Sequence, residues 1–402
     1  MPDHETLGDR IARLRNRRRL TQDQLAAEAR VSVDVIRKLE QHQRHSARLS
    51  TIGAIARALD VDPAELVGRE RGLGDSAEDS EMYHLRRATL DLIPYPDEPL
   101  PDLAVLDTQV RDLWDQYWVG RYGYLARALP ALVTQVRATA QAAAGGNRVP
   151  AHATLASVLQ LMAALLTRLA HEDLAHIALA DATRAAEVTG DELLHASQQA
   201  ARVWLLSCQG LHTEAEQLAV DIAHQVEPAL SRDSADRIAV WGELLRYATH
   251  AAAGTPQREA EARELQRLVS AAAEALGPRQ PTIGPATVFS PTVAGMNGVT
   301  VCVELDDPRT ALTRAAQVES PESAPPAIQV RYLLAVAMAQ TMTWDNQAAV
   351  DTLLRAEQIS AELMRHMVLA RTVVEELLPR RRTQRLPGLT SLAGRLGIKV
   401  HE

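Results

Sequence analysis

From residue 103 onward the chain alternates long segments rich in alanine and leucine with breaks of only a few residues. Within a segment the apolar residues recur at spacings of three and four, as Ala182, Ala185 and Ala186 do, which places them on one face of a helix. Alanine and leucine also have high helix propensities, and runs of β-branched residues are scarce. The pattern predicts an all-α fold.

The helical segments come in pairs, and glycine stands at several of the breaks, among them Gly120, Gly210 and Gly254. The expected pairs are 103–119 with 122–144, 152–170 with 173–189, 192–208 with 212–226, 233–253 with 257–276, 293–306 with 308–318, and 326–343 with 346–360, followed by 361–378. Helix pairs that repeat roughly every 35–45 residues are typical of an α-solenoid. The pairs resemble tetratricopeptide repeats, which implies a helical-repeat domain over residues 82–402.

Charge divides the chain into two parts. The whole chain carries a net charge of −8, yet residues 10–50 carry +7 and residues 1–71 carry +3, so the remainder carries −11. A basic head on an acidic body predicts contact with a polyanion through the head alone. Residues 69–81 are polar, acidic and contain glycine, so we expect a linker there, after a domain of residues 1–68.

The head has the cap and core pattern of five short helices. Thr21 and Gln24 form a capping-box pattern at one helix start, and Ser32 caps the next helix. The strings LTQDQLA at residues 20–26 and IRKLE at residues 36–40 resemble the phage-repressor-like XRE family of helix-turn-helix proteins. Arg30 departs from that family, which usually has glycine in the tight turn.

The resemblance implies roles for individual residues. Gln22 is implied to clamp a DNA phosphate, and the exposed face of the recognition helix is implied to enter the major groove. The candidate residues on that face are Ser32, Val33, Asp34, Arg37 and Lys38. An arginine or lysine there can read guanine and an aspartate can accept from cytosine, although Asp34 can also simply pair with a basic neighbour along the helix. Phosphate contacts are expected from Arg17, Arg18, Arg19, Arg44 and Arg48.

A curved stack of helix pairs has a concave face, and several large side chains are candidates for a ligand pocket on it. These candidates are Trp114, Tyr117, Trp118, Arg202, Trp204, Trp241, Arg246 and Asn297. Aromatic rings with interspersed arginines can hold a peptide or a flat small molecule, whereas each such residue alone more often packs between helices. Asn297 is included because residues 289–312 resemble a stretch of actinobacterial XRE regulators with helical-repeat bodies, in which histidine is usual at this position.

No motif for catalysis stands out in the sequence. His171 and His176 lie five residues apart, whereas metal ligation from one helix face requires a spacing of four. There is no CxxC pair, phosphate-binding glycine loop or GxSxG turn. We therefore expect no enzyme, no cofactor and no metal. No stretch approaches the roughly 18 apolar residues of a membrane span, so we expect a cytoplasmic, nucleoid-associated protein without membrane contact.

Together these features predict a sequence-specific DNA-binding transcriptional regulator. One such domain covers one half-site, so we expect a homodimer on a palindromic double-stranded operator. The architecture resembles peptide-sensing quorum regulators with tetratricopeptide bodies, which implies that the repeats sense a small molecule or peptide. The alternative is a protein-interaction scaffold of tetratricopeptide-like repeats in which DNA contact is secondary.

Overall fold

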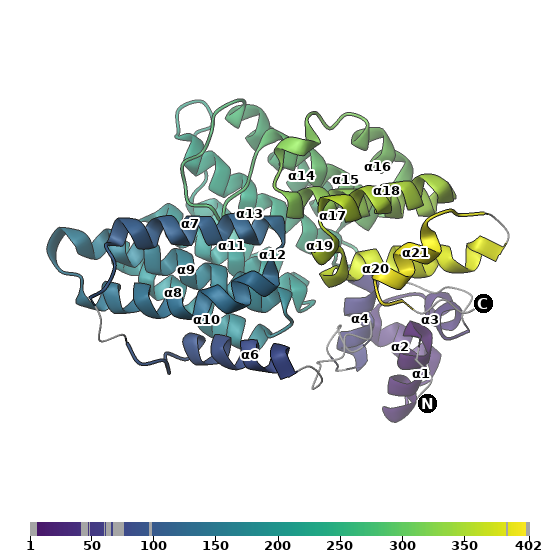
Figure 1. Cartoon of the computed structure of the whole chain (residues 1–402). Helices are drawn as coiled ribbons and strands as arrows, with labels where there is room; N and C mark the ends of the chain where they lie inside the picture. The colour runs from purple at the N-terminus through teal and green to yellow at the C-terminus, as the bar shows by residue number, and fades with distance from the viewer. Residues whose placement is uncertain are drawn as a thin grey trace.

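The structure, a computed structural model, describes residues 6–41, 47, 49–59, 61, 66, 76–95, 99–382 and 385–398. Over these residues the chain forms helices and no strand, which confirms the predicted all-α fold. A small N-terminal domain lies against one end of a large body of paired helices (Figure 1).

The N-terminal domain packs its described helices around one apolar core. These helices are α1 (Leu7–Arg17), α2 (Gln22–Ala29), α3 (Val33–Glu40) and α4 (Leu49–Leu59). The Thr21 side chain accepts from the Gln24 backbone and the Gln24 side chain accepts from the Thr21 backbone, so the predicted capping box is present. A fifth helix, expected near Leu66, falls mostly outside the described residues.

The turn between α2 and α3 has the left-handed conformation that usually selects glycine. Arg30 occupies it with φ 53° and ψ 39°, and its N–H donates to the carbonyls of Ala26 and Ala27. A residue with a Cβ atom pays roughly 1 kcal/mol for this conformation. The departure from the family at Arg30 therefore leaves the turn intact and adds strain to it.

The body consists of sixteen helices among the described residues, with short 3-10 turns between some of them. They are α6 (Ser76–Thr89), α7 (Leu103–Val119), α8 (Tyr122–Ala142), α9 (Arg148–Arg168), α10 (Glu172–Thr189), α11 (Glu192–Cys208), α12 (His212–Gln225), α13 (Ala235–Ala253), α14 (Glu259–Leu276), α15 (Pro291–Glu304), α16 (Pro308–Ala315), α17 (Pro326–Met342), α18 (Asn346–Ile359), α19 (Ala361–His366), α20 (Val368–Leu377) and α21 (Leu389–Arg395). The pairs from α7 to α18 match the predicted pairs to within a few residues. Two details differ: the segment expected at 361–378 breaks at Met367, and α6 begins at Ser76, inside the stretch expected to be a linker.

Most of the pairs turn in the same way, with one left-handed residue between the two helices. Gly120 and Gly210 have this conformation, but so do Ala170, Asp306 and Trp344. In each case the next residue donates its N–H to the carbonyl five residues back, as the Schellman motif requires. Glycine therefore marks only some of the turns.

The first helices of the pairs form a closed ring in the described part of the chain. Helices α7, α9, α11, α13, α15 and α17 contact one another in that order, and α17 contacts α7 again. Two hydrogen bonds near this closure join distant segments: Trp118 Nε1 donates to the Pro285 carbonyl at 2.9 Å, and the Gly123 N–H donates to Glu362 Oε1 at 3.1 Å. The stack thus curls back on itself, and its inner helices surround a common centre.

Helix α9 with the turn before it, residues 145–168, is long and apolar enough to cross a membrane by length and composition. Most of its apolar window, 67%, is buried inside the body, where α9 packs against α8 and α10. Such burial is typical of a core helix.

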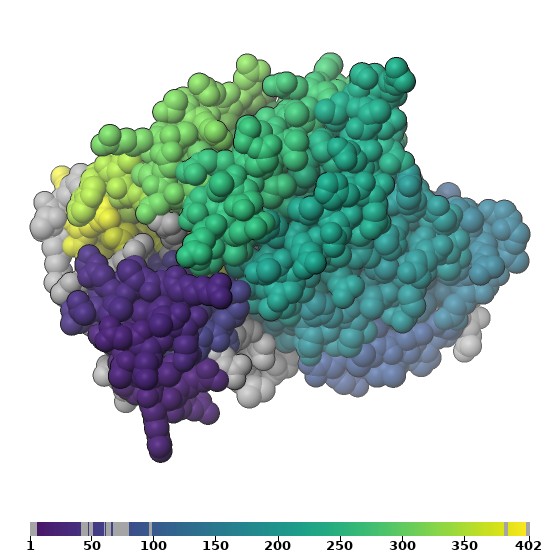
Figure 2. All heavy atoms as spheres, turned by 180° about the vertical axis from the view of Figure 1, so that it is seen from behind, coloured from purple at the N-terminus to yellow at the C-terminus, as the bar shows by residue number. Residues whose placement is uncertain are grey.

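The N-terminal domain contacts the body through α4 and the end of α2. A Cβ atom placed on Gly53 of α4 would lie 3.8 Å from both the Gly210 Cα and His212 Nε2. Beside this contact, Arg30 and Val31 line a small cleft with residues 253–256 of the body. Figure 2 shows the rest of the domain projecting from the body.

Candidate DNA-binding surface and central cavity

The recognition helix α3 is fixed at its end by an ion pair. The Glu40 carboxylate accepts from Arg15 Nε at 2.7 Å and from Arg15 Nη2 at 2.8 Å. This pairing raises the pKa of Arg15, although burial opposes the shift. Gln22 Nε2 also donates to Glu40 at 2.7 Å, so the residue implied to clamp a phosphate joins the start of α2 to the end of α3.

The outward face of α3 carries the expected reading residues. Asp34, Arg37 and Lys38 are exposed, and Lys38 Nζ lies 2.7 Å from Asp34 Oδ2. Both side chains of this pair are about half exposed, so the pair contributes at most about 0.5 kcal/mol and can separate at little cost on DNA. Ser32 caps α3 by accepting from the Val35 N–H, and Val33 is half-buried against the core.

The expected phosphate contacts divide into three groups. Arg17 and Arg19 are exposed at the end of α1. Arg18 is also exposed, yet its Nη1 donates to the Ala58 carbonyl at 3.0 Å and joins α1 to α4. Arg44 and Arg48 lie outside the described residues and side chains.

Five of the eight predicted ligand-pocket residues line one cavity at the centre of the ring. Trp114, Tyr117 and Trp118 come from α7, Trp204 from α11 and Arg246 from α13. Trp114 Nε1 donates to Ser157 Oγ at 3.1 Å, and Trp118 is anchored by the Pro285 carbonyl. The cavity has a volume of about 50 Å³, enough for a few water molecules.

The other three predicted pocket residues do not line this cavity. Arg202 precedes Trp204 by two positions, about 200° around the helix, and is exposed. Trp241 precedes Arg246 by five positions, about 140° around the helix, and packs in the apolar core with Phe289.

Asn297, the third of these residues, is buried on α15, where its Nδ2 donates to Gln266 Oε1 at 2.7 Å. Asn297 therefore joins α15 to α14, away from the cavity.

The sequence reasoning missed the charged residues that dominate the cavity. Arg168, Glu243 and Arg331 line it, together with Gln160 and Tyr247. Arg331 is the one charged residue of the otherwise apolar helix α17, and Glu243 is followed closely by Arg246 in the apolar helix α13. An isolated charge in an apolar helix is a signal of a buried polar site, and it could have identified these residues.

Three arginines and one carboxylate line the cavity. Glu243 is paired with Arg246, through Arg246 Nη2 at 2.5 Å and Nε at 3.1 Å. The guanidinium carbons of Arg331 and Arg168 lie 4.3 and 5.2 Å from the centre of the Trp204 ring. Burial, and after it the neighbouring Arg168 and Arg246, lower the pKa of Arg331 to about 10, so Arg331 stays charged at neutral pH.

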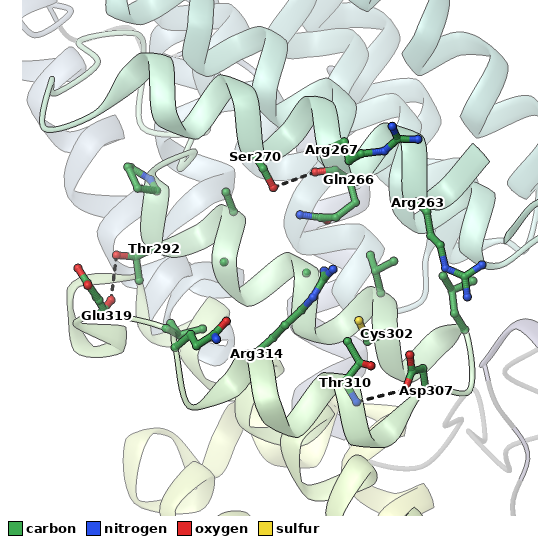
Figure 3. A pocket seen from close by; sticks show the side chains of 18 residues that line it. Arg263, Gln266, Arg267, Ser270, Thr292, Cys302, Asp307, Thr310, Arg314 and Glu319 are labelled. Carbon is green, nitrogen blue, oxygen red and sulfur yellow. Dashed lines mark hydrogen bonds between the residues drawn. The ribbon is translucent and has the colours of Figure 1, made fainter. Parts of the chain in front are cut away.

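A second, larger cavity of about 680 Å³ is an open groove between α14, α15 and α16. Figure 3 shows Arg263 and Arg314 reaching into it from α14 and α16. Of its two acidic residues, Asp307 and Glu319, the first is already used, because the Asp307 carboxylate caps α16 by accepting from the Thr310 N–H at 3.1 Å. Gly295 and Gly298 of α15 form part of its floor.

No group of three or more histidine, cysteine or acidic residues that could hold a metal ion occurs in the described part of the chain. His176, one of the two histidines considered above, bonds instead to Gln209 at 3.0 Å.

The N-terminal domain matches known proteins. Residues 6–67 match the family described as the helix-turn-helix domain. An immunity repressor protein of Bacillus phage phi105 is 40% identical over 65 residues, which cover 16% of this chain and 44% of the repressor. The chain thus spans less than half the length of this curated relative.

Two solved structures are similar over nearly the whole chain, at low scores. A PrgX mutant matches at 11% identity with a TM-score of 0.28, covering 98% of this chain and 100% of the other. A PrgX/iCF10 complex matches at 10% identity with a TM-score of 0.29, covering 97% and 94%.

Proposed function

Because residues 6–67 are a helix-turn-helix domain, we propose that the protein is a transcriptional regulator that binds double-stranded DNA through α3. The observation that carries this proposal is the exposed face of α3, which presents Arg37 and Lys38. Arg17 and Arg19 are exposed at the end of α1 in the same domain. The acidic body repels DNA, so contact is confined to the domain that projects from it.

The remaining parts of the proposal follow from this function. One domain covers a single half-site, so the regulator acts as a homodimer on a palindromic operator in the cytoplasm, at the nucleoid. The body senses a small molecule in the central cavity. A peptide is less well supported, because a cavity of about 50 Å³ has no room for one in this state.

The test is the salt dependence of DNA binding by the full chain. Phosphate contacts release counterions, so affinity for a selected operator should fall steeply between about 50 and 200 mM salt. The Arg17→Ala variant should show a shallower slope than the wild type. A flat response in the wild type would contradict the regulator and favour the protein-interaction scaffold.

A further inference from the structure

The central cavity holds a buried arginine, Arg331, whose charge no carboxylate among the described residues neutralises. Its charged lining consists of Arg168, Arg246, Arg331 and a single carboxylate, Glu243. That carboxylate is 2% exposed and makes a two-point pair with Arg246. The Arg331 guanidinium stacks on the face of the Trp204 ring, and it has no carboxylate partner among the described residues.

Such an arrangement is costly unless an anion completes it. Buried charges in proteins are normally paired, and two guanidinium groups near one indole repel each other. The rest of the body is strongly acidic, so the basic centre is not a consequence of overall composition. Nearby, the Tyr122 hydroxyl is buried and has no hydrogen-bond partner among the residues that the structure describes.

The lining also defines the shape of what the site accepts. Trp114, Tyr117, Trp118, Trp204 and Tyr247 supply aromatic surfaces around the arginines. A guanidinium group donates its N–H groups, in its own plane, to the oxygens of a carboxylate or phosphate. Aromatic faces pack against flat apolar groups. The free volume matches an oxyanion group and not a peptide.

We propose that the central cavity binds the oxyanion group of a small molecule, a carboxylate or a phosphate, between Arg331 and Arg168. Trp204 and the rings of α7 then lie beside the oxyanion group. The inference rests on the proposed function in one respect, because the anion is taken as the effector of the DNA-binding step. Binding itself needs no DNA, so the two proposals can fail separately.

The experiment measures thermal unfolding and titration calorimetry of the full chain with inorganic phosphate, benzoate and benzamide. Phosphate tests the bare oxyanion, benzoate adds a flat ring, and benzamide keeps the ring without the charge. We expect benzoate or phosphate to raise the unfolding midpoint, and benzamide to leave it unchanged. No effect of either anion, or an effect of benzamide equal to that of the anions, would overturn the proposal.

Matched variants locate the site. Arg331→Met removes the charge and keeps an unbranched apolar side chain, and we expect it to bind the anion at least tenfold more weakly. Arg168→Met serves the same purpose if the first variant does not fold. Arg314→Met removes a charge from the outer groove and should bind like the wild type. If Arg314→Met loses binding, or both cavity variants keep it, the anion does not bind in the central cavity and the proposal is wrong.

Discussion

The guanidinium of Arg15 and the carboxylate of Glu40 form a two-point ion pair that connects the end of α1 to the end of α3. The two side chains are 13% and 6% exposed, so solvent screens the pair only weakly. Because Gln22 donates to the same carboxylate, one acidic group sets the relative positions of three helices. Helix α3, the proposed recognition helix, is thereby held in a fixed orientation within the domain.

Replacing Glu40 with glutamine should destabilise the DNA-binding domain by about 3 kcal/mol, because it leaves the nearly buried Arg15 without its counter-charge. Chemical denaturation of the full chain, followed by hydrogen exchange in residues 7–40, measures the loss. Asp34→Asn is the matched control, since it breaks the exposed pair with Lys38 on the same helix and should cost at most about 0.5 kcal/mol. Equal losses in the two variants would contradict the role given to Glu40.

Arg37→Ala should relax the base preference of the protein, because Arg37 lies on the exposed face of α3. Arg17→Ala should weaken binding to all sequences by a similar factor, because a phosphate contact carries no sequence information. Selection of sites from random DNA with each variant distinguishes the two. Arg18 is unsuitable as the comparison, since its bond to the Ala58 carbonyl makes its loss structural as well. If the Arg37 and Arg17 variants select the same sites, the reading role of Arg37 is refuted.

Gly120→Ala should cost about 3 kcal/mol of stability. Its φ of +89° is strained for alanine, and the added Cβ would lie 2.3 Å from Cγ of the buried Leu363. Gly190→Ala, at φ +69° with no atom within 4 Å of the added carbon, should cost only about 1 kcal/mol. Denaturant unfolding of both variants gives the difference, and similar losses would show that Leu363 moves aside freely.

Acidification should weaken the contact between the DNA-binding domain and the body. The pKa of His212 is lowered by burial first and then by Arg57 on α4. Because Arg57 lies on α4, its effect is lost on undocking, and the docked state binds fewer protons at His212 than the undocked state; docking is therefore favoured above about pH 6.5 and weakens below it. The other groups that act on His212 are Glu304 and Glu214, which raise its pKa, and His250, which lowers it.

Small-angle scattering between about pH 7.5 and 5.5 measures this opening as a rise in the radius of gyration. His212→Gln should remove the pH dependence. If the wild type and the His212→Gln variant expand equally on acidification, groups other than His212 cause the opening.

Arg331→Met should make the protein without ligand more stable by about 1 kcal/mol. Arg331 is a buried charge with no carboxylate partner among the described residues, so an apolar side chain in its place relieves the desolvation cost. Denaturant unfolding in a chloride buffer without phosphate or carboxylate measures the change. Arg355→Met, at an exposed position of α18, should leave stability within about 0.5 kcal/mol of the wild type. A loss of stability in Arg331→Met alone would mean that the stacking on Trp204 outweighs the charge.

The helix pairs could be predicted because each obeys a local rule, namely apolar spacing within a helix and a short turn after it. The ring could not. The contact of α17 with α7 joins segments more than 200 residues apart, and it depends on the sum of small rotations between successive pairs, which no local pattern encodes.

The cavity could be predicted only in part. Trp114, Trp118 and Trp204 are large amphipathic side chains, which reveal a possible pocket from the sequence alone. Arg331 gives a weaker signal, because an arginine on a helix usually faces water and its burial follows from the closure of the ring. Arg202 and Trp241 lie outside this cavity because they stand on other faces of α11 and α13 than Trp204 and Arg246.

The closure of the ring also bears on how such a chain can evolve. Open solenoids commonly change length by duplicating or losing a repeat, since each repeat contacts only its neighbours. Here an extra helix pair would separate Trp118 from the Pro285 carbonyl and Gly123 from Glu362, and would open the cavity that they help to enclose. Variation in this lineage should therefore appear as substitutions on the inner helices and as insertions in the outer turns, at a constant number of repeats.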